Sequence, residues 1–289
     1  MSLYPRTTER AFILINSMRT VAFVLLALFA AGDILASNHC GEITGGTSPR
    51  GAVYQIRVPQ DWNGKLAVFS PGYQMEDHGP ALPLKTEDPI ACRLLEAGWL
   101  VAETSFHRAG FIQEDGIEDI DWIYQYVVEE YGKPKFAASV GISTGALIAA
   151  MMSERAESNY NGYLAISPIL GMDGFESRNK LTVAPKWPLI LMPNQNEARD
   201  AATYKEISES RSERSPALWI ILREGHCRIS PGEYLAALRG LERWSKGQEI
   251  EMLRRLAIPE ENVQSRATHA DGMATAEVEY IYPGFGNLH

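Results

Sequence analysis

The sequence FAASVGISTGALIAA, at residues 136–150, carries the clearest signal of a fold. Its first five residues form an apolar run of the length of a strand buried on both faces, and its last five begin a helix. So short a turn between strand and helix leaves no room for side chains at Gly141 and Gly145. Ser143, midway between them, is therefore expected in a strained conformation with its hydroxyl exposed above a sheet. The alternative is an ordinary tight glycine turn around a buried serine.

The rest of the chain alternates between strand and helix patterns on both sides of this stretch. Such repeated alternation predicts an α/β fold, with a mostly parallel central sheet and helices on both faces. We expect residues 38–289 to form a single domain, with an added edge strand at Ala276–Tyr282. The predicted strands are residues 53–58, 66–69, 99–102, 136–140, 163–166, 189–192 and 218–222. The predicted helices are residues 90–97, 116–131, 146–156, 198–209 and 233–246.

The length and charge of the chain exclude several classes of protein. With 289 residues it is long enough to bury a large core, and its composition is that of a globular protein. The formal net charge of -9 would repel phosphate backbones, so we expect no nucleic-acid partner. Three cysteines are too few for a disulfide scaffold.

The N-terminal residues 1–36 have the pattern of an export segment. Arg19 precedes the apolar run VAFVLLALFAA at residues 21–31, and small residues follow it up to Ala36. The run is short for a membrane span, so a cleaved signal peptide is expected, with an uncleaved anchor as the alternative. We therefore predict a secreted or periplasmic protein without stable membrane insertion after cleavage. The pairing of Cys40, Cys92 and Cys227 stays open.

A serine hydroxyl needs a base, and His226 is the candidate among six histidines. It lies in REGHCRIS, residues 223–230, directly after the predicted strand at residues 218–222. Sites in parallel sheets are built from loops at the carboxyl ends of strands, which favours this histidine. A structural histidine is the alternative, and a zinc site lacks a cluster of further ligands.

The acid that orients this base is expected between Ser143 and His226 in the sequence. Glu197 is the first acidic residue after the apolar strand at residues 189–192, and it is our choice. Asp200 is the second candidate, followed by Asp173 and Glu176. Glu197 has another interpretation, because an acidic side chain also stabilises the beginning of a helix.

The oxyanion hole is predicted from two backbone amides, those of Tyr73 and Thr144. Thr144 follows the serine at the start of a helix, where amides are unpaired. Gly72, in the segment SPGYQ after the predicted strand at residues 66–69, lets the backbone approach a substrate, although a plain turn is the alternative. Three further residues are candidates for the substrate pocket or for ordinary surface: His107, Arg108 and Phe111.

The segments GISTG, SPGY and EGHCRIS together resemble the α/β-hydrolase superfamily over roughly residues 51–247. More narrowly, VPQDWNGKLAVFSPGYQ, GWLVAETSFHRAG and EEYGKPKFAASVGISTG resemble exported bacterial hydrolases of the esterase or prolyl-oligopeptidase kind. The resemblance implies the α/β-hydrolase fold, with Ser143 as nucleophile, His226 as base and Glu197 as acid. Ser70-Pro71 departs from the usual His-Gly, Glu197 replaces the commoner Asp, and residues 168–187 are too few for a large lid.

These residues predict a serine hydrolase that cleaves carboxylic esters through an acyl-enzyme, on small-molecule or polymer substrates. A serine peptidase of the prolyl-oligopeptidase type is one alternative, and an inactive hydrolase-like binding protein is another. The sequence has neither a phosphate-cradling glycine loop nor metal-ligand spacing, so we expect no cofactor and no metal.

Overall fold

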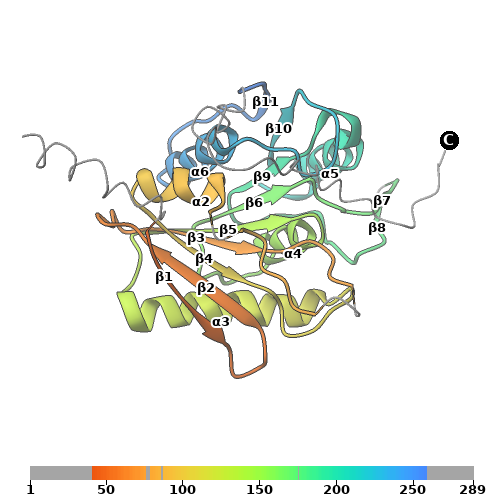
Figure 1. Ribbon diagram of the computed structural model, residues 1–289. Coiled ribbons are helices and arrows are strands. Elements are labelled where there is room, and N and C mark those ends of the chain that lie inside the picture. The colour runs from red at the N-terminus through yellow and green to blue at the C-terminus, as the bar shows by residue number, and fades with distance from the viewer. Residues whose placement is uncertain (1–40, 76–78, 86, 175, 259–289) are drawn as a thin grey trace, which may run out of the picture.

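A nine-stranded sheet forms the centre of the molecule (Figure 1). The computed structural model describes residues 41–75, 79–85, 87–174 and 176–258. The strand order is β1-β2-β4-β3-β5-β6-β9-β10-β11. The pairs β1–β2 and β2–β4 are antiparallel and the other six pairs are parallel. The strands are β1 Glu42–Thr47, β2 Val53–Val58, β3 Lys65–Ser70, β4 Trp99–Thr104, β5 Phe136–Ile142, β6 Gly162–Ile166, β9 Leu189–Met192, β10 Ala217–Ile221 and β11 Leu253–Leu256.

Helices cover both faces of this sheet and enclose two hydrophobic cores (Figure 1). One core lies under α2 (Pro89–Glu96) and α6 (Pro231–Ser245). The other lies under α3 (Gln113–Tyr131), α4 (Thr144–Ser153) and α5 (Ala198–Arg211). Burial of apolar surface is the dominant favourable term in folding, so these two cores hold the helices against the sheet.

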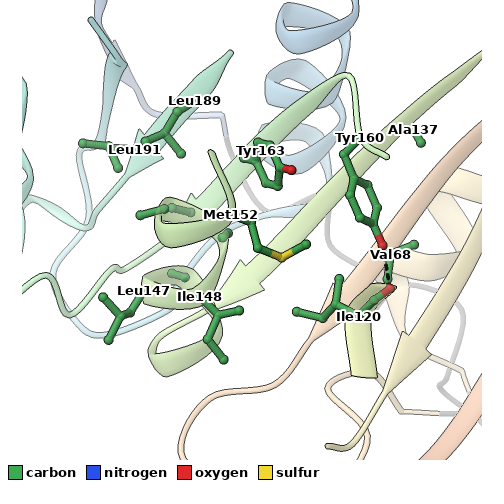
Figure 2. Close-up of a cluster of buried hydrophobic side chains, with 14 of the residues drawn as sticks. Val68, Ile120, Ala137, Leu147, Ile148, Met152, Tyr160, Tyr163, Leu189 and Leu191 are labelled. Atoms are coloured by element: carbon green, nitrogen blue, oxygen red, sulfur yellow. Dashed lines mark hydrogen bonds between the residues drawn. The ribbon is translucent and has the colours of Figure 1, made fainter. Parts of the chain in front are cut away.

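The core beneath α4 shows how the central part of the fold is packed (Figure 2). Leu147, Ile148 and Met152 of α4 lie among side chains from the sheet and from α3. Tyr160 is also buried there, and its hydroxyl donates to the Ile120 carbonyl at 2.8 Å. A buried hydroxyl must be hydrogen-bonded to avoid a desolvation cost, so this contact lets a polar group lie within the core.

Local sequence signals set the ends of two helices. Ser230 caps α6, with its hydroxyl accepting from the Glu233 amide while the Glu233 carboxylate accepts from the Ser230 amide. Pro231 follows at the first helical position, where its missing N–H costs nothing. The Asp88 carboxylate accepts from the Ile90 amide at the start of α2.

A buried ion pair joins β2 to β4. Arg57 and Glu103 are both fully buried, with Nη1 and Oε1 2.5 Å apart. The second Glu103 oxygen accepts from the Leu84 amide, and Arg57 Nη2 donates to the Lys85 carbonyl. Burial raises the pKa of Glu103 to about 7, although the adjacent Arg57 opposes the shift. The pair therefore ties the segment before α2 to the sheet.

The predicted fold class, a mostly parallel sheet with helices on both faces, is confirmed. Every helix and strand expected between residues 53 and 246 is present, with ends that differ by a few residues. The sequence patterns did not reveal β1, β11 or the small pair β7 (Met172–Asp173) and β8 (Glu176–Ser177). The predicted export segment at 1–36 and edge strand at Ala276–Tyr282 lie outside the described residues. Within the part of the chain that is described, no helix is long and apolar enough to span a bilayer.

We predict that Arg57→Met lowers the free energy of unfolding by about 3–5 kcal/mol, because it leaves a buried carboxylate without its counter-ion. Arg57→Met combined with Glu103→Gln should cost less, since the glutamine is neutral and its carbonyl still accepts from Leu84. Urea denaturation measures both variants. Arg93→Met, which breaks the exposed pair with Glu96, serves as control and should stay within about 0.5 kcal/mol. A double variant as unstable as the single one would contradict this account.

Candidate active site

The segment between β5 and α4 makes the turn that the sequence predicts. A Cβ atom built on Gly141 would lie 2.0 Å from the Gly145 carbonyl oxygen, so only glycine fits. A Cβ atom on Gly145 would lie 2.5 Å from the Pro71 carbonyl oxygen, so the loop after β3 packs directly on the turn. Ser143 has φ 55° and ψ -110°, a conformation that L-residues rarely adopt. Its amide donates to the Ile166 carbonyl at 2.9 Å, which holds the turn against β6.

Three side chains from separate loops form a continuous chain of hydrogen bonds. Ser143 Oγ lies 2.9 Å from His226 Nε2, and His226 Nδ1 lies 2.7 Å from Glu197 Oε2. Ser143 is only 1% exposed, contrary to the expected exposed hydroxyl, because the His226 ring contacts the oxygen. Strand order explains the meeting, since β5, β6, β9 and β10 are neighbours and their carboxyl ends share one edge of the sheet.

The loop that carries His226 is fixed by polar side chains that the sequence patterns did not single out. Asn194 is fully buried, accepts from the Arg228 amide at 3.0 Å and donates to the Arg228 carbonyl at 3.0 Å. Ser167 Oγ accepts from the Cys227 amide, and Asn196 Oδ1 accepts from the Gly225 amide. These bonds satisfy backbone groups on both sides of the histidine and hold the loop in one conformation.

A sequence signal for these supporting residues exists, although it is indirect. Ser167 directly follows β6, and Asn194 follows β9 after one proline, so both come from carboxyl ends of central strands. Asn194 also forms a parallel bridge with Ile221, which places it between the ends of β9 and β10. Polar residues at the carboxyl ends of parallel strands are expected to face the site. The sequence pattern does not show which loop they bind.

Glu197 is the partner of the histidine and also closes the capping box of a short 3-10 turn. It ends a 3-10 turn at Gln195–Glu197, and its Oε1 accepts from the Asn194 amide at 3.3 Å. Its other oxygen contacts His226. The residue directly precedes α5, but its side chain makes no capping hydrogen bond to that helix, so the contacts support the interpretation as partner of the histidine. The second candidate acid, Asp200, lies in the first turn of α5. The remaining candidates Asp173 and Glu176 face each other in the small β7–β8 pair.

The surroundings of His226 favour its charged form. Hydrogen bonds with Cys227 and with Glu197 raise its pKa to about 10, and partial burial opposes them only in part. Cys227 is a free thiol next to the histidine in the chain, with φ 59°. A positive charge on the imidazole is therefore stabilised from two sides.

The two predicted oxyanion donors lie on the two segments that meet at the turn. Thr144 is the first residue of α4, where helix amides have no partner within the helix. Gly72 and Tyr73 follow Pro71, whose carbonyl faces Gly145. The amide of Tyr73 thus belongs to a segment that packs against the beginning of α4.

The three predicted pocket residues lie on the loop after β4, in different environments. His107 Nδ1 is 2.8 Å from Asp119 Oδ2, and Arg108 forms an ion pair with Asp115. Both acids belong to α3, so these two side chains are engaged by that helix. Phe111 is half exposed and lies against the Tyr73 ring, with ring centroids 6.3 Å apart.

The described residues include neither a metal site nor a second free cysteine. Cys92 is disulfide-bonded, whereas Cys227 is free, and Cys40 lies outside the described residues. Among the residues that the structure describes, no group of three or more His, Cys, Asp or Glu side chains is arranged to hold a metal ion.

Comparisons with known proteins agree with this architecture. No family model matches the sequence. An o-phthalyl amidase of Xanthobacter agilis is 28% identical over 136 residues, which is 45% of this chain and only 28% of the amidase. An esterase of Pyrococcus furiosus superposes with a TM-score of 0.52 at 16% identity, over 70% of this chain and 89% of that one. A dienelactone hydrolase of Anabaena variabilis gives a TM-score of 0.50 at 13% identity, over 72% and 98%.

The resemblance seen in the sequence is confirmed at the level of the fold. The structural likenesses cover 89% and 98% of these two chains, and the sheet places the Ser143 turn at the end of its middle strand. The protein therefore has the α/β-hydrolase fold.

Proposed function

We propose that the protein is a serine hydrolase that cleaves carboxylic esters through an acyl-enzyme intermediate. The observation that carries this proposal is the hydrogen-bonded chain from Ser143 through His226 to Glu197. Nucleophile and base lie within hydrogen-bonding distance, and the base is oriented by a third group, which is the arrangement that activates a serine hydroxyl. The similarity to an esterase in fold is consistent with this chemistry without specifying it.

The geometry suggests a role for each group in the two steps. Ser143 Oγ attacks the carbonyl carbon while His226 Nε2 takes its proton, and Glu197 stabilises the resulting imidazolium. The amides of Thr144 and Tyr73 donate to the oxyanion, each contributing about 3 kcal/mol to the transition state. His226 then returns the proton to the leaving group, and a water molecule repeats the sequence to release the acid.

Amide hydrolysis is the second candidate, and the similarity to an o-phthalyl amidase favours it. An amine leaves only when it is protonated, and the stabilised imidazolium of His226 is the group that supplies this proton. A peptidase of the prolyl-oligopeptidase type would use the same residues. The alternative of an inactive binding protein is less consistent with a complete and well-aligned chain of hydrogen bonds.

Export also stays a proposal. It rests on the apolar run at residues 21–31 and on the disulfide at Cys92, because disulfides persist in oxidising compartments. A mature N-terminus beginning near residue 37 in culture medium or periplasm would support it.

Ser143→Ala should abolish covalent labelling by a fluorophosphonate probe and lower ester hydrolysis by at least about a thousand-fold, because it removes the attacking oxygen. Ser139→Ala is the matched control, since Ser139 is a fully buried serine of β5, the strand that ends directly before Ser143. Labelling is read by mass spectrometry of the intact protein. A Ser143→Ala variant that is still labelled places the nucleophile elsewhere.

Glu197→Gln should lower kcat by about 1,000- to 10,000-fold, because the amide neither stabilises the imidazolium nor fixes its tautomer. Asp200→Asn should leave kcat nearly unchanged, since His226 bonds to Glu197 and Asp200 lies within α5. Steady-state hydrolysis of p-nitrophenyl acetate compares the two variants. If the Asp200 variant is the slower one, the assignment of the acid is wrong.

The pH dependence of kcat/KM should be alkaline. His226 accepts a proton only when neutral, and its contacts raise its pKa from 6.5 to about 10, so kcat/KM rises with pH through a midpoint above 6.5. Cys227→Ala removes the largest cause of the shift and should move the midpoint toward 6.5. The same linkage makes the imidazolium stabilise the folded state below pH 6.5, an effect lost as pH rises toward 10. A wild-type midpoint at or below 6.5 would show that these contacts do not stabilise the imidazolium.

A further inference from the structure

Exposed aromatic side chains gather beside the candidate active site. Within the described residues, five large hydrophobic side chains are exposed, and three of these lie on two loops next to the Ser143 turn. Tyr73 and Met75 belong to the loop after β3, and Phe111 belongs to the loop after β4. Exposed apolar groups that cluster, in contrast to scattered ones, mark surfaces that bind something.

Backbone contacts join these two loops to each other and to the nucleophile. The Gly110 amide donates to the Gln74 carbonyl at 2.9 Å, directly beside the two aromatic residues. Gln74 is buried and its side chain donates to the Ala81 carbonyl, so the neighbouring Tyr73 and Met75 face outward from a fixed point. Pro71, two residues before Tyr73, packs its carbonyl against Gly145, two residues after Ser143.

The rings of Tyr73 and Phe111 lie side by side and form one surface. Their centroids are 6.3 Å apart and their planes are inclined by 42°. Tyr73 is 40% exposed and Phe111 is 50% exposed, so each ring uses part of its surface for the other and presents the rest to solvent. The exposed part of each ring can make edge or face contacts with a further aromatic ring.

The polar groups of the same loop are already neutralised. Asp119 holds His107 through its ring and its backbone amide, and Asp115 pairs with Arg108 and with Arg50. The loop after β4 is thereby fastened to α3 while Phe111 stays exposed. The chemistry that this surface offers a ligand is therefore apolar and aromatic, with no uncompensated charge contributed by these pairs.

We propose that the aromatic surface formed by Tyr73 and Phe111 binds an aromatic ring of the substrate, next to the bond that Ser143 attacks. The proposal rests on the proposed hydrolase function and adds its substrate class: esters that carry an aryl group on the acyl or the alcohol side. The exposed rings gain burial when such a substrate binds, and a substrate with a short alkyl group leaves them in water.

The test compares selectivity between substrates, so that changes in overall activity cancel. Phenyl acetate carries the ring on the alcohol side and ethyl phenylacetate carries it on the acyl side, and each is compared with ethyl acetate. We expect Phe111→Ala to lower at least one of the two kcat/KM ratios by about tenfold, the equivalent of about 1.4 kcal/mol. The ratio that falls identifies the side that the surface binds.

Two control variants separate the loss of the aromatic ring from other effects of substitution at an exposed position. Phe111→Tyr keeps the ring and should keep the wild-type ratios. Leu253→Ala removes an even more exposed hydrophobic side chain from β11, at the far edge of the sheet, and should leave both ratios unchanged. Unchanged ratios in Phe111→Ala, or the same loss in Phe111→Tyr, would overturn the proposal.

Fluorophosphonate labelling of Ser143 keeps this test separate from the proposed function. If the wild type and Phe111→Ala are both labelled but the ratios do not change, the aromatic surface is wrong and the hydrolase function stands. If the wild type is not labelled at Ser143, the hydrolase function itself fails.

Discussion

The close approach of β5 and α4 at residues 141–145 governs the geometry of the whole site. With glycine at both ends, the strand passes into the helix within a distance that a single Cβ atom would block. The strain of this turn lies at Ser143, whose backbone has a positive φ. The surrounding sheet holds the residue in that conformation. Because β5 is the middle strand of the nine, the serine is placed where loops from both halves of the sheet reach it.

The histidine depends on a second constraint, the hydrogen bonds that hold the backbone of its loop. The loop after β10 contains residues with unusual conformations at Gly225 and Cys227, which leave amides and carbonyls without regular partners. Asn194 and Ser167 supply those partners from the ends of β9 and β6. A hydrogen bond of this kind contributes about 0.5–1.5 kcal/mol, so together these bonds favour one loop conformation. The position of the imidazole over Ser143 follows from this preference.

The loops after β3 and β4, on the other side of the serine, differ from the loop that carries the histidine. Their polar side chains are bound to α3 or to backbone, as with Asp119 and His107, and their aromatic side chains remain in solvent. The buried pair of Arg57 and Glu103 holds the segment that leads from the loop after β3 to α2, because it binds the Leu84 amide and the Lys85 carbonyl. The molecule thus presents a polar, hydrogen-bonded side carrying the base and an apolar side carrying Tyr73 and Phe111.

Local patterns in the chain were enough to predict the fold class and most helices and strands, because buried strands, helical stripes and glycine turns are signals between near neighbours. They also indicated Ser143, His226 and Glu197, since each follows a predicted central strand. They did not reveal β1 and β11, whose glycines and arginines are not typical of strands and which exist only by pairing with β2 and β10. The folded structure was needed to show that Glu197, in preference to Asp200, contacts the histidine. The same holds for the supporting bonds of Asn194 and Ser167 and for the contact of Tyr73 with Phe111. These depend on distances between segments far apart in the chain, and such distances are set by the packing of the whole sheet.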